Sequence, residues 1–527
     1  MNEIKELNNL LSKLVDQGLY PGFQWQITIK NEIFSGKYGF NNIENKDPIL
    51  ENTIYRIWSM TKPIVAVAAL QLIQEDKIFL DDPISKYLPQ FSNQLRIATR
   101  NFGDITPGDI FQYINNEGYS ALDKALFEMS PEEVVEEVKN SGLRGRGGAA
   151  FPTGVKWSFL APNQASTKYV LCNCEEGDPG AYNDKGILET DPHTLVEGLI
   201  LNGYATNSNK SYVFIRQGHD IPINAIERAI KEAYDNGILG ENILGSNFSF
   251  DMEVSLTGDS YVAGEETALM EAIEGKRSTP RFKPPFPAAS GLWKKPTNIN
   301  NVKTISYVPE IIKNGSEWFK GTGTEKSTGT AIVCLSGHIN RPGMYEIPMG
   351  MTINDVLENI GGGSNSETDI KMLQTGGPLG GVLGKEAFST KIDFDEMAKS
   401  GAILGSGGII VCDESVSVVD LIRNLVAFNQ FESCGKCFPC RLGNTHMYDV
   451  LDRLCNSKSE PNDLALLERI GNSMKIGSLC GHGQLGYNPI SSSLKYFQSE
   501  ISDSINNISE PLEKMLIPTR TRPNNLE

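Results

Sequence analysis

Three cysteines of this 527-residue chain stand close enough in sequence to hold one inorganic centre. They form the motif Cys434-Gly-Lys-Cys437-Phe-Pro-Cys440. The C-x2-C-x2-C spacing lets three thiolates on one tight loop bind irons of a [4Fe–4S] cube, while a fourth thiolate comes from elsewhere. Structural zinc is the alternative, although zinc usually uses two separated C-x2-C pairs. The motif therefore favours one-electron chemistry.

Two later cysteines could supply the fourth thiolate. Cys455 ends the segment 450–455 (VLDRLC), which has the pattern of an amphipathic helix, so a buried structural thiol is expected there. Cys480 lies between two glycine-containing segments in a predicted loop and is the better candidate. The nine cysteines are not expected to form disulfides, because the chain reads as a cytosolic protein whose thiols stay reduced.

A dense glycine stretch at 142–154 reads GLRGRGGAAFPTG. It contains a G-x-G-x-x-A match, but a predicted helix precedes it, whereas a dinucleotide-binding βαβ unit requires a strand there. The amides of such a loop can still approach a phosphate, and Arg144, Arg146 and Lys156 add positive charge. A tight surface loop is the alternative interpretation.

Two acidic clusters follow segments that read as strands. Glu175-Glu176-Gly-Asp178 comes after residues 169–171, and Gly264-Glu265-Glu266 comes after residues 260–262. Carboxylates at strand ends can contact ribose hydroxyls or a flavin ring, although acidic residues more often form a solvated face.

The elements that must position these residues fall into four predicted blocks: 1–92, 96–325, 326–412 and 413–527. The second block alternates strands with helices, one of which begins at Ser130-Pro-Glu-Glu, and is an α/β pattern. The third predicts strands at 331–335 and 343–347, a helix at 353–360 and a glycine-rich tail. The fourth is predicted to be helical.

Composition excludes two classes of function. The net charge of −17 argues against general nucleic-acid binding, which requires basic surface. The longest apolar run, 63–73, is shorter than the roughly 18 residues of a membrane helix. With no signal peptide expected at the N-terminus, the chain is predicted to be cytoplasmic, and any place at the cytoplasmic face of the membrane would come through partner subunits.

Together these motifs resemble the flavoprotein (51-kDa, or F) subunit of respiratory complex I and the related diaphorase subunits of NAD-dependent formate dehydrogenases and hydrogenases. The resemblance covers about 96–497, roughly three quarters of the chain. Its carriers are 141–157 (SGLRGRGGAAFPTGVKW), 172–185 (CNCEEGDPGAYNDK), 257–275 (TGDSYVAGEETALMEAIEG), 281–288 (RFKPPFPA), 295–302 (KPTNINNV) and 432–443 (ESCGKCFPCRLG). Relatives commonly have Gly at Ala150, Asp at Glu175 and Cys at Ala263.

The resemblance implies a multidomain α/β fold: an FMN-binding α/β domain, a β-grasp-like (SLBB) module and a helical [4Fe–4S] domain. It implies FMN held by Gly145, Gly147, Lys156, Asn173, Gly264, Glu265, Asn300 and Asn301. It implies NADH stacked over the flavin near Phe151, Phe159, Phe286, Lys283, Asp178 and Glu266. It also implies Cys434, Cys437, Cys440 and Cys480 as cluster ligands.

The implied activity is hydride transfer from NADH to FMN, followed by single-electron transfer to the cluster and on to partner subunits. The usual partner in this family is a thioredoxin-like [2Fe–2S] subunit. The ultimate couple could be quinone, formate or hydrogen. NADH is favoured over NADPH, because Asp178 and Glu266 should repel a 2′-phosphate.

Residues 1–91 resemble a different family, the start of a class C β-lactamase or related serine hydrolase. Ser59 and Lys62 fit its S-x-x-K motif, in which the lysine helps to deprotonate the serine. The letter matches to its other motifs, Tyr113-Ile-Asn115 and Lys399-Ser-Gly401, lie in the flavoprotein region and are interpreted as coincidence. The block therefore predicts a truncated segment, with β-lactam or ester hydrolysis as the alternative function.

Overall fold

The computed structural model describes residues 2–17, 21–29, 32–42, 46–50, a few positions between 67 and 77, and 95–506. The chain divides into two compact units, Met1–Ser92 and Asn93–Glu527. Within the apolar run at 63–73 and the residue after it, the structure describes 67, 71, 73 and 74, which are helical. Ser59 and Lys62 lie outside the described residues.

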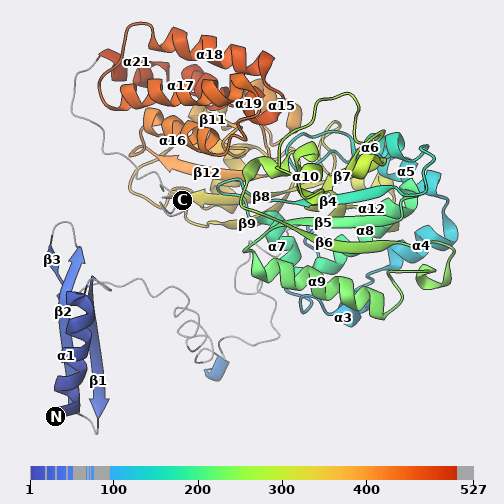
Figure 1. Ribbon diagram of the computed structural model, residues 1–527, viewed down its shortest axis with the longest axis horizontal. Helices are drawn as coiled ribbons and strands as arrows, with labels where there is room; N and C mark the ends of the chain where they lie inside the picture. The colour runs from blue at the N-terminus through green and yellow to red at the C-terminus, as the bar shows by residue number, and fades with distance from the viewer. Residues whose placement is uncertain are drawn as a thin grey trace. The chain divides into compact units, whose positions relative to one another are not determined.

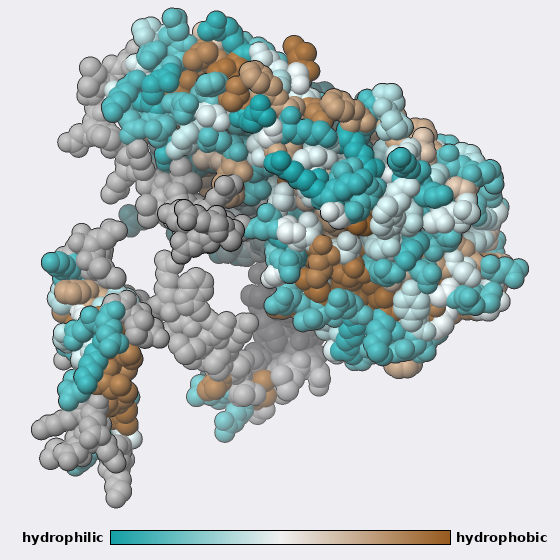
Figure 2. All heavy atoms as spheres, in the orientation of Figure 1, coloured by the Kyte–Doolittle hydropathy of each residue, from teal (hydrophilic) through white to brown (hydrophobic). Residues whose placement is uncertain are grey.

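The first unit consists of α1 (Asn2–Asp16), β1 (Gly22–Ile29), β2 (Glu32–Asn42) and β3 (Asp47–Pro48). β1 and β2 form an antiparallel hairpin, and the Trp25 indole donates to the Asn8 side chain at 3.3 Å, which joins β1 to α1. Apolar side chains such as Ile33, with 67% of its surface exposed, remain at the surface. Figure 2 shows a hydrophobic strip along this unit.

The second unit begins with a parallel four-stranded sheet of order β6-β5-β4-β7 (Figure 1). Its strands are β4 (Tyr169–Cys174), β5 (Lys210–Arg216), β6 (Asp251–Thr257) and β7 (Thr297–Asn301). Alternate side chains of β4 enter different cores, Val170 and Cys172 toward α8 and α9, and Leu171 toward α10. Helices therefore cover both faces, as a parallel sheet requires, and the carboxyl ends of the strands share one edge.

The helices of this region surround the sheet in chain order. They are α3 (Ile110–Asn115), α4 (Ser120–Glu128), α5 (Pro131–Asn140), α6 (Thr153–Leu160), α7 (Asn183–Thr190), α8 (Pro192–Thr206), α9 (Asp220–Asp235), α10 (Glu266–Ile273), α11 (Val302–Ser306), α12 (Val308–Asn314) and α13 (Ser316–Lys320). The predicted start of α5 is confirmed, with a capping box between Ser130 and Glu133. The strand predicted at 260–262 is wrong: Tyr261–Gly264 is a 3-10 turn after β6.

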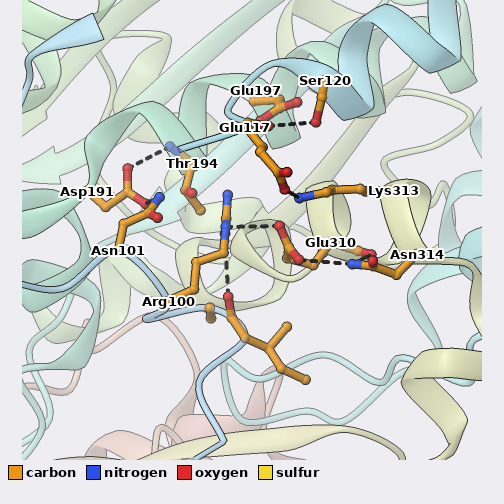
Figure 3. Close-up of polar contacts among 12 residues, drawn as sticks. Arg100, Asn101, Glu117, Ser120, Asp191, Thr194, Glu197, Glu310, Lys313 and Asn314 are labelled. Atoms are coloured by element: carbon orange, nitrogen blue, oxygen red, sulfur yellow. Dashed lines mark hydrogen bonds and ion pairs between the residues drawn. The ribbon is translucent and has the colours of Figure 1, made fainter. Parts of the chain in front are cut away.

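A buried polar network attaches the segment that precedes α5 to the helices beneath it (Figure 3). Arg100 pairs with Glu310 of α12 at 2.9 Å, and Asn101 donates to Asp191 before α8 at 2.8 Å. Glu197 of α8 accepts hydrogen bonds from the Tyr113 hydroxyl at 2.6 Å and from a backbone amide of α4. Tyr113 is fully buried, so its hydroxyl belongs to this network and not to an open site.

A second sheet follows, with order β11-β10-β12-β8-β9. Its strands are β8 (Thr330–Gly337), β9 (Gly343–Pro348), β10 (Ile370–Thr375), β11 (Gly381–Gly384) and β12 (Gly408–Asp413), with α14 (Ile353–Asp355) and α15 (Phe394–Ser400) between them. The expected glycine-rich tail is therefore largely folded, because β10 pairs with both β11 and β12. The predicted helix at 353–360 is α14 continued by a π-helical turn.

The C-terminal part is helical, as predicted. It contains α16 (Val418–Phe431), α17 (Phe438–Cys455), α18 (Asp463–Gly477), α19 (Gly481–Gln484), α20 (Asn488–Tyr496) and α21 (Gln498–Asn506). Cys455 is 1% exposed within the core of these helices, which confirms its structural interpretation. Within the described ranges, no helix combines the length and the apolar character needed to cross a membrane.

Candidate functional site

A cavity of about 310 Å³ opens at the carboxyl ends of β4 and β7. Its walls come from the glycine loop, the residues that follow β4, the turn before α10, loops of the second sheet and the segment around Cys480. The lining residues used below are Gly147, Asn173, Glu175, Glu176, Asp178, Asp184, Tyr261, Gly264, Glu265, Asn301, Gly376, Ser406 and His482. A volume of this order suits a small cofactor.

The glycine loop forms one wall through its backbone. A Cβ on Gly147 would lie 2.6 Å from the Cβ of Asn301, so only glycine allows the loop to approach β7 this closely. The expectation that Arg144 and Arg146 supply positive charge for a phosphate is not what the contacts show. Arg146 is 3% exposed and donates to the carbonyls of Thr328 and Thr330, while Arg144 pairs with Asp395 at 3.2 Å. Both arginines fasten the loop to the second sheet.

Polar residues at the end of β4 form the opposite wall. The Asn173 side chain donates to the Gly264 carbonyl at 2.8 Å and accepts from the Glu175 amide at 3.0 Å, which joins β4 to the turn before α10. Glu175 pairs with Arg216 at 2.8 Å. Asp178 accepts from Ser406 of the second sheet, yet its Oδ1 is buried and meets no hydrogen-bond partner among the described residues. That atom is an acceptor that a ligand donor could satisfy.

Burial shifts the acid–base behaviour of these carboxyls. Desolvation raises the pKa of Glu175 to about 7, against the opposing effect of Arg216. Burial, reinforced by repulsion from Asp184, raises the pKa of Glu176. Burial also raises the pKa of Asp178, only partly offset by the Ser406 hydroxyl. Perturbed carboxyls gathered in one cavity are a physical mark of a functional site.

A second group of predicted residues lies beside this cavity without lining it. Glu266 pairs with Lys156 at 3.3 Å and with Lys283, whose ammonium also reaches Glu265 of the cavity at 3.5 Å. Three exposed phenylalanines belong to the same segments: Phe151, Phe159 and Phe286. The first two rings lie 6.3 Å apart. Exposed aromatic rings beside paired charges offer stacking surface and polar contacts to a large planar ligand.

The four cysteines predicted as cluster ligands surround one further small pocket. Cys434, Cys437, Cys440 and Cys480 line it together with Ser433, Lys436 and His482. Cys437 caps the N-terminus of α17, Cys440 lies in its first turn, and Cys480 caps α19. No three His, Cys, Asp or Glu side chains of the described part of the chain are grouped tightly enough for one metal ion.

The surroundings of the Cys440 thiol suit a negatively charged, thiolate-bound inorganic centre. Burial raises the pKa of Cys480 to about 12 and that of Cys440 to about 11. Iron would replace the protons, since thiolates bind metals and thiols do not. Ser433 lies 3.3 Å from the Cys440 sulfur and Asn444 lies 3.5 Å from it, and the N-terminus of α17 favours negative charge there.

The two cavities adjoin. Val262, Cys480 and His482 line both of them, so the thiol pocket begins where the larger cavity ends. The imidazole of His482 is held by the Asn429 carbonyl at 2.8 Å and lies 5.7 Å from the ring of Tyr261. An electron could therefore pass from a group in the larger cavity to the cysteine-bound centre over a short distance.

The structure brings together only part of the predicted cofactor set. Six predicted residues line the larger cavity: Gly147, Asn173, Asp178, Gly264, Glu265 and Asn301. Gly145 hydrogen-bonds within the glycine loop, and Asn300 is buried against Asn298. The second sheet also contributes Gly376, Gly405 and Ser406, which were not predicted from the sequence. Paired glycines at 376–377 and 407–408 were the sequence signal for these loops, which reach the cavity through tertiary contacts alone.

The residues present fit FMN and an iron–sulfur cluster. Gly147 and Gly264 let the backbone pack closely against Asn301 and Glu175, and the walls built in this way enclose the cavity of about 310 Å³ that a flat ring could enter. The unsatisfied Asp178 oxygen supplies a polar anchor. Four thiols around one pocket match the number and type of ligands that a [4Fe–4S] cube requires.

Comparison with known families assigns most of the second unit. The Nuo51 FMN-binding domain matches residues 138–310, the SLBB domain matches 332–383, and the NADH-ubiquinone oxidoreductase-F iron-sulfur binding region matches 420–504. A beta-lactamase family matches residues 7–149. The last match runs from the first unit into the helices that carry the Figure 3 network.

Individual relatives agree with the family matches. The NADP-reducing hydrogenase subunit HndC of Solidesulfovibrio fructosivorans is 46% identical over 77% of this chain and 83% of its own. An F subunit of the NADH-quinone oxidoreductase of Rhizobium meliloti is 42% identical over 75% and 94%, and the F subunit of the Escherichia coli enzyme is 37% identical over 80% and 95%. The solved NAD+-reducing [NiFe]-hydrogenase in its H2-reduced state superposes with a TM-score of 0.68, at 26% identity over 84% of this chain and 73% of that one.

Proposed function

Because this chain belongs to the family of NADH-quinone oxidoreductase F subunits and related hydrogenase subunits, we propose that it oxidises NADH through FMN and a [4Fe–4S] cluster. The observation that carries the proposal is the shared wall of the two cavities at Val262, Cys480 and His482. FMN, when bound, accepts two electrons as hydride and can release them singly, which a cluster requires.

We assign the cavity-lining residues to FMN. Gly147 gives the flavin access to the wall formed by β7, while Asn173, Gly264, Glu265 and Asn301 offer polar contacts. Lys156, beside the cavity, is proposed to contribute positive charge to the flavin phosphate. Glu266 and Lys283 belong to the proposed nucleotide side, where Phe151, Phe159 and Phe286 provide apolar surface. Gly145 and Asn300 do not line the cavity, and their proposed role is to support the glycine loop and the strand β7 that do.

We assign Cys434, Cys437, Cys440 and Cys480 to the cluster. Their pocket lies beside the flavin cavity, and Ser433 and Asn444 place donors near the Cys440 sulfur. Donors to cluster sulfurs tune the reduction potential. The nine cysteines form no disulfide and suit a reducing compartment, so a cytoplasmic location is part of this proposal.

Partner subunits complete the electron path. The relatives named above are subunits of larger complexes, so this chain also functions as a subunit. We propose a thioredoxin-like [2Fe–2S] protein among its partners, following the pattern of the family. The partners would determine whether quinone, formate or hydrogen is the final couple, and they would provide any attachment to the membrane.

NADH is the proposed donor, although one relative is named for NADP. Asp178 and Glu266 are carboxylates that disfavour a 2′-phosphate. Glu266 is already paired with two lysines, so the preference should be measured. We expect kcat/KM for NADH to exceed that for NADPH by at least about tenfold, roughly the effect of one unfavourable charge contact. Equal values would show that the two lysines neutralise the carboxylate.

The spectrum of the purified chain tests the central proposal. Protein prepared anaerobically should contain FMN that bleaches on addition of NADH, with iron and sulfide each near four per chain, as a cube requires. A folded protein without flavin and iron that ignores NADH would reject the proposal. β-Lactam or ester hydrolysis is not proposed, because the family matches at 138–310 and 420–504 and the relatives named above support electron transfer.

A further inference from the structure

We propose that Lys303 is a positioning residue of the flavin site, whose buried ammonium group stands behind the cavity wall and favours the reduced, more negative flavin. The inference rests on the proposed function, since it concerns the same cavity. Lys303 belongs to α11, immediately after β7, and only 1% of its surface is exposed. A lysine is almost never buried to this degree unless a partner holds it.

One of the hydrogen bonds of Lys303 leads through Asp184 to the cavity wall. Its Nζ donates to Asp184 Oδ1 at 2.8 Å. The other oxygen of Asp184 accepts from the Asn301 side chain at 2.6 Å. Asp184 and Asn301 both line the cavity, so the ammonium lies one side chain behind it. This chain of bonds fixes the Asn301 amide against the glycine loop.

The other hydrogen bond of Lys303 leads to the second sheet. Lys303 Nζ donates to Asn183 Oδ1 at 2.8 Å, and the Asn183 amide donates to the carbonyls of Ile332 and Ser406 at 3.1 and 2.7 Å. Ser406 in turn hydrogen-bonds Asp178 inside the cavity. One ammonium therefore holds two walls of the cavity that come from different sheets.

The Lys303 ammonium also provides a positive charge next to a cavity that is lined by carboxyls. Five carboxyls line it: Glu175, Glu176, Asp178, Asp184 and Glu265. Arg216 is committed to Glu175 and Asp259, and the Lys283 side chain remains 30% exposed, whereas Lys303 is fully enclosed. Burial by itself would lower the pKa of Lys303, but Asp184 and Glu176 raise it above its ordinary value, so the charge persists.

A buried positive charge should act more strongly on the reduced flavin than on the oxidised one, because reduction adds negative charge to the cavity. We expect Lys303→Met to weaken the preference for reduced over oxidised flavin about tenfold, which for two electrons lowers the midpoint potential by about 30 mV. Asp184→Asn leaves the ammonium unbalanced and should shift the potential in the opposite direction. The double variant should return close to the unmodified protein.

Opposite shifts distinguish charge from structure. A merely structural role predicts that both single variants loosen the cavity in the same way. Lys303→Arg should retain the potential if the larger group is accommodated. Lys168→Met is the matched control, since this lysine is also buried but binds the Leu160 and Ala161 carbonyls at the opposite end of β4. It should lower stability and leave the potential unchanged.

The experiment is a redox titration of flavin on the full chain, followed by absorbance, with flavin affinity and iron content measured alongside. Opposite shifts in the single variants and recovery in the double variant support the proposal, and if Lys303→Met fails to fold, Asp184→Asn and the double variant carry the same comparison. Equal potentials throughout, or shifts of one sign, overturn it. If the unmodified chain binds no flavin, the proposed function itself fails.

Discussion

Residue 150 places a side chain where the backbone favours glycine. Ala150 has a φ of +52° in the glycine loop. The left-handed region costs a residue with a Cβ about 1–2 kcal/mol, of which the greater chain entropy of glycine cancels about 0.5–1. Ala150→Gly should therefore stabilise the protein by about 0.5–1 kcal/mol. A rise in Tm without loss of bound flavin would show this.

The neighbouring Ala149 provides the control for that substitution. Its backbone is outside the left-handed region, so Ala149→Gly removes no strain and should lower Tm slightly. Equal responses at both positions would mean that loop entropy, and not the conformation of Ala150, decides the outcome.

Glu175 makes the stability of the protein depend on pH. Its pKa is raised to about 7 in the folded chain, against an ordinary value of 4.5. The folded state therefore binds the proton more tightly, and the associated stability is fully present below pH 4.5 and lost as pH rises through 7. The loss is at most about 3 kcal/mol. Urea unfolding at pH 5 and pH 7.5 should show a smaller difference in Glu175→Gln than in the unmodified chain.

If Glu175→Gln kept the full difference in unfolding free energy between the two pH values, other carboxyls would be responsible for the pH dependence. Glu176 and Asp178 are the candidates, since burial also raises their pKa values. Arg216 keeps Asp259 as a partner in the variant, so the substitution leaves no unpaired buried guanidinium.

At the scale of elements, the sequence predicted those helices, strands and loops whose signal lies within one short segment. The capping box of α5 and the strands β4, β8 and β9 followed from short segments, and the cysteine spacing indicated the cluster loop. The strands β10 to β12 were missed, because each is only four to six residues long and lies among glycine-rich turns, so none shows the extended alternation that identifies a strand. Their loops reach the flavin cavity only through pairing across the second sheet, which no local pattern records.

The helix α17 carries one cysteine of each kind, which allows a matched test. Cys440 in its first turn faces the thiol pocket, and Cys455 in its last turn is buried in the helical core. Cys440→Ser should lose most of the iron and sulfide, as should Cys480→Ser, because a cube needs four thiolates. Cys455→Ser should keep the iron and lower stability by about 1–3 kcal/mol, because it buries a hydroxyl in an apolar core. Iron analysis that gave the reverse result would reassign the ligand.

Two positively charged residues in and after the glycine loop have different roles: Arg146 holds the structure together, whereas Lys156 is proposed to act on the ligand. Arg146 donates to three carbonyls, those of Arg144, Thr328 and Thr330, and lies over the rings of Tyr307 and Phe394. Arg146→Met should lower Tm markedly, with a loss of about 2–4 kcal/mol from unsatisfied buried carbonyls. Lys156→Met should instead weaken flavin binding with little change in Tm. Thermal unfolding and flavin titration of both variants test this. Weaker flavin binding in Arg146→Met together with a lower Tm in Lys156→Met would reverse the two roles.

The whole molecule consists of an electron-transfer unit and a first unit of separate character. All residues that line the two cavities belong to Asn93–Glu527. The beta-lactamase family matches residues 7–149, which span the first unit and the beginning of the second, where Tyr113 is fully buried and bonded to Glu197. The family resemblance of each unit therefore concerns different chemistry.

Removal of residues 1–92 tests that separation. We expect the shortened chain to retain flavin, iron and NADH-driven reduction of ferricyanide within about twofold of the full chain, a difference below about 0.5 kcal/mol, because both cavities remain complete. Neither protein should hydrolyse nitrocefin. Loss of flavin on truncation would show that the first unit supports the cavity, and nitrocefin hydrolysis abolished by Ser59→Ala would establish an independent hydrolase in this chain.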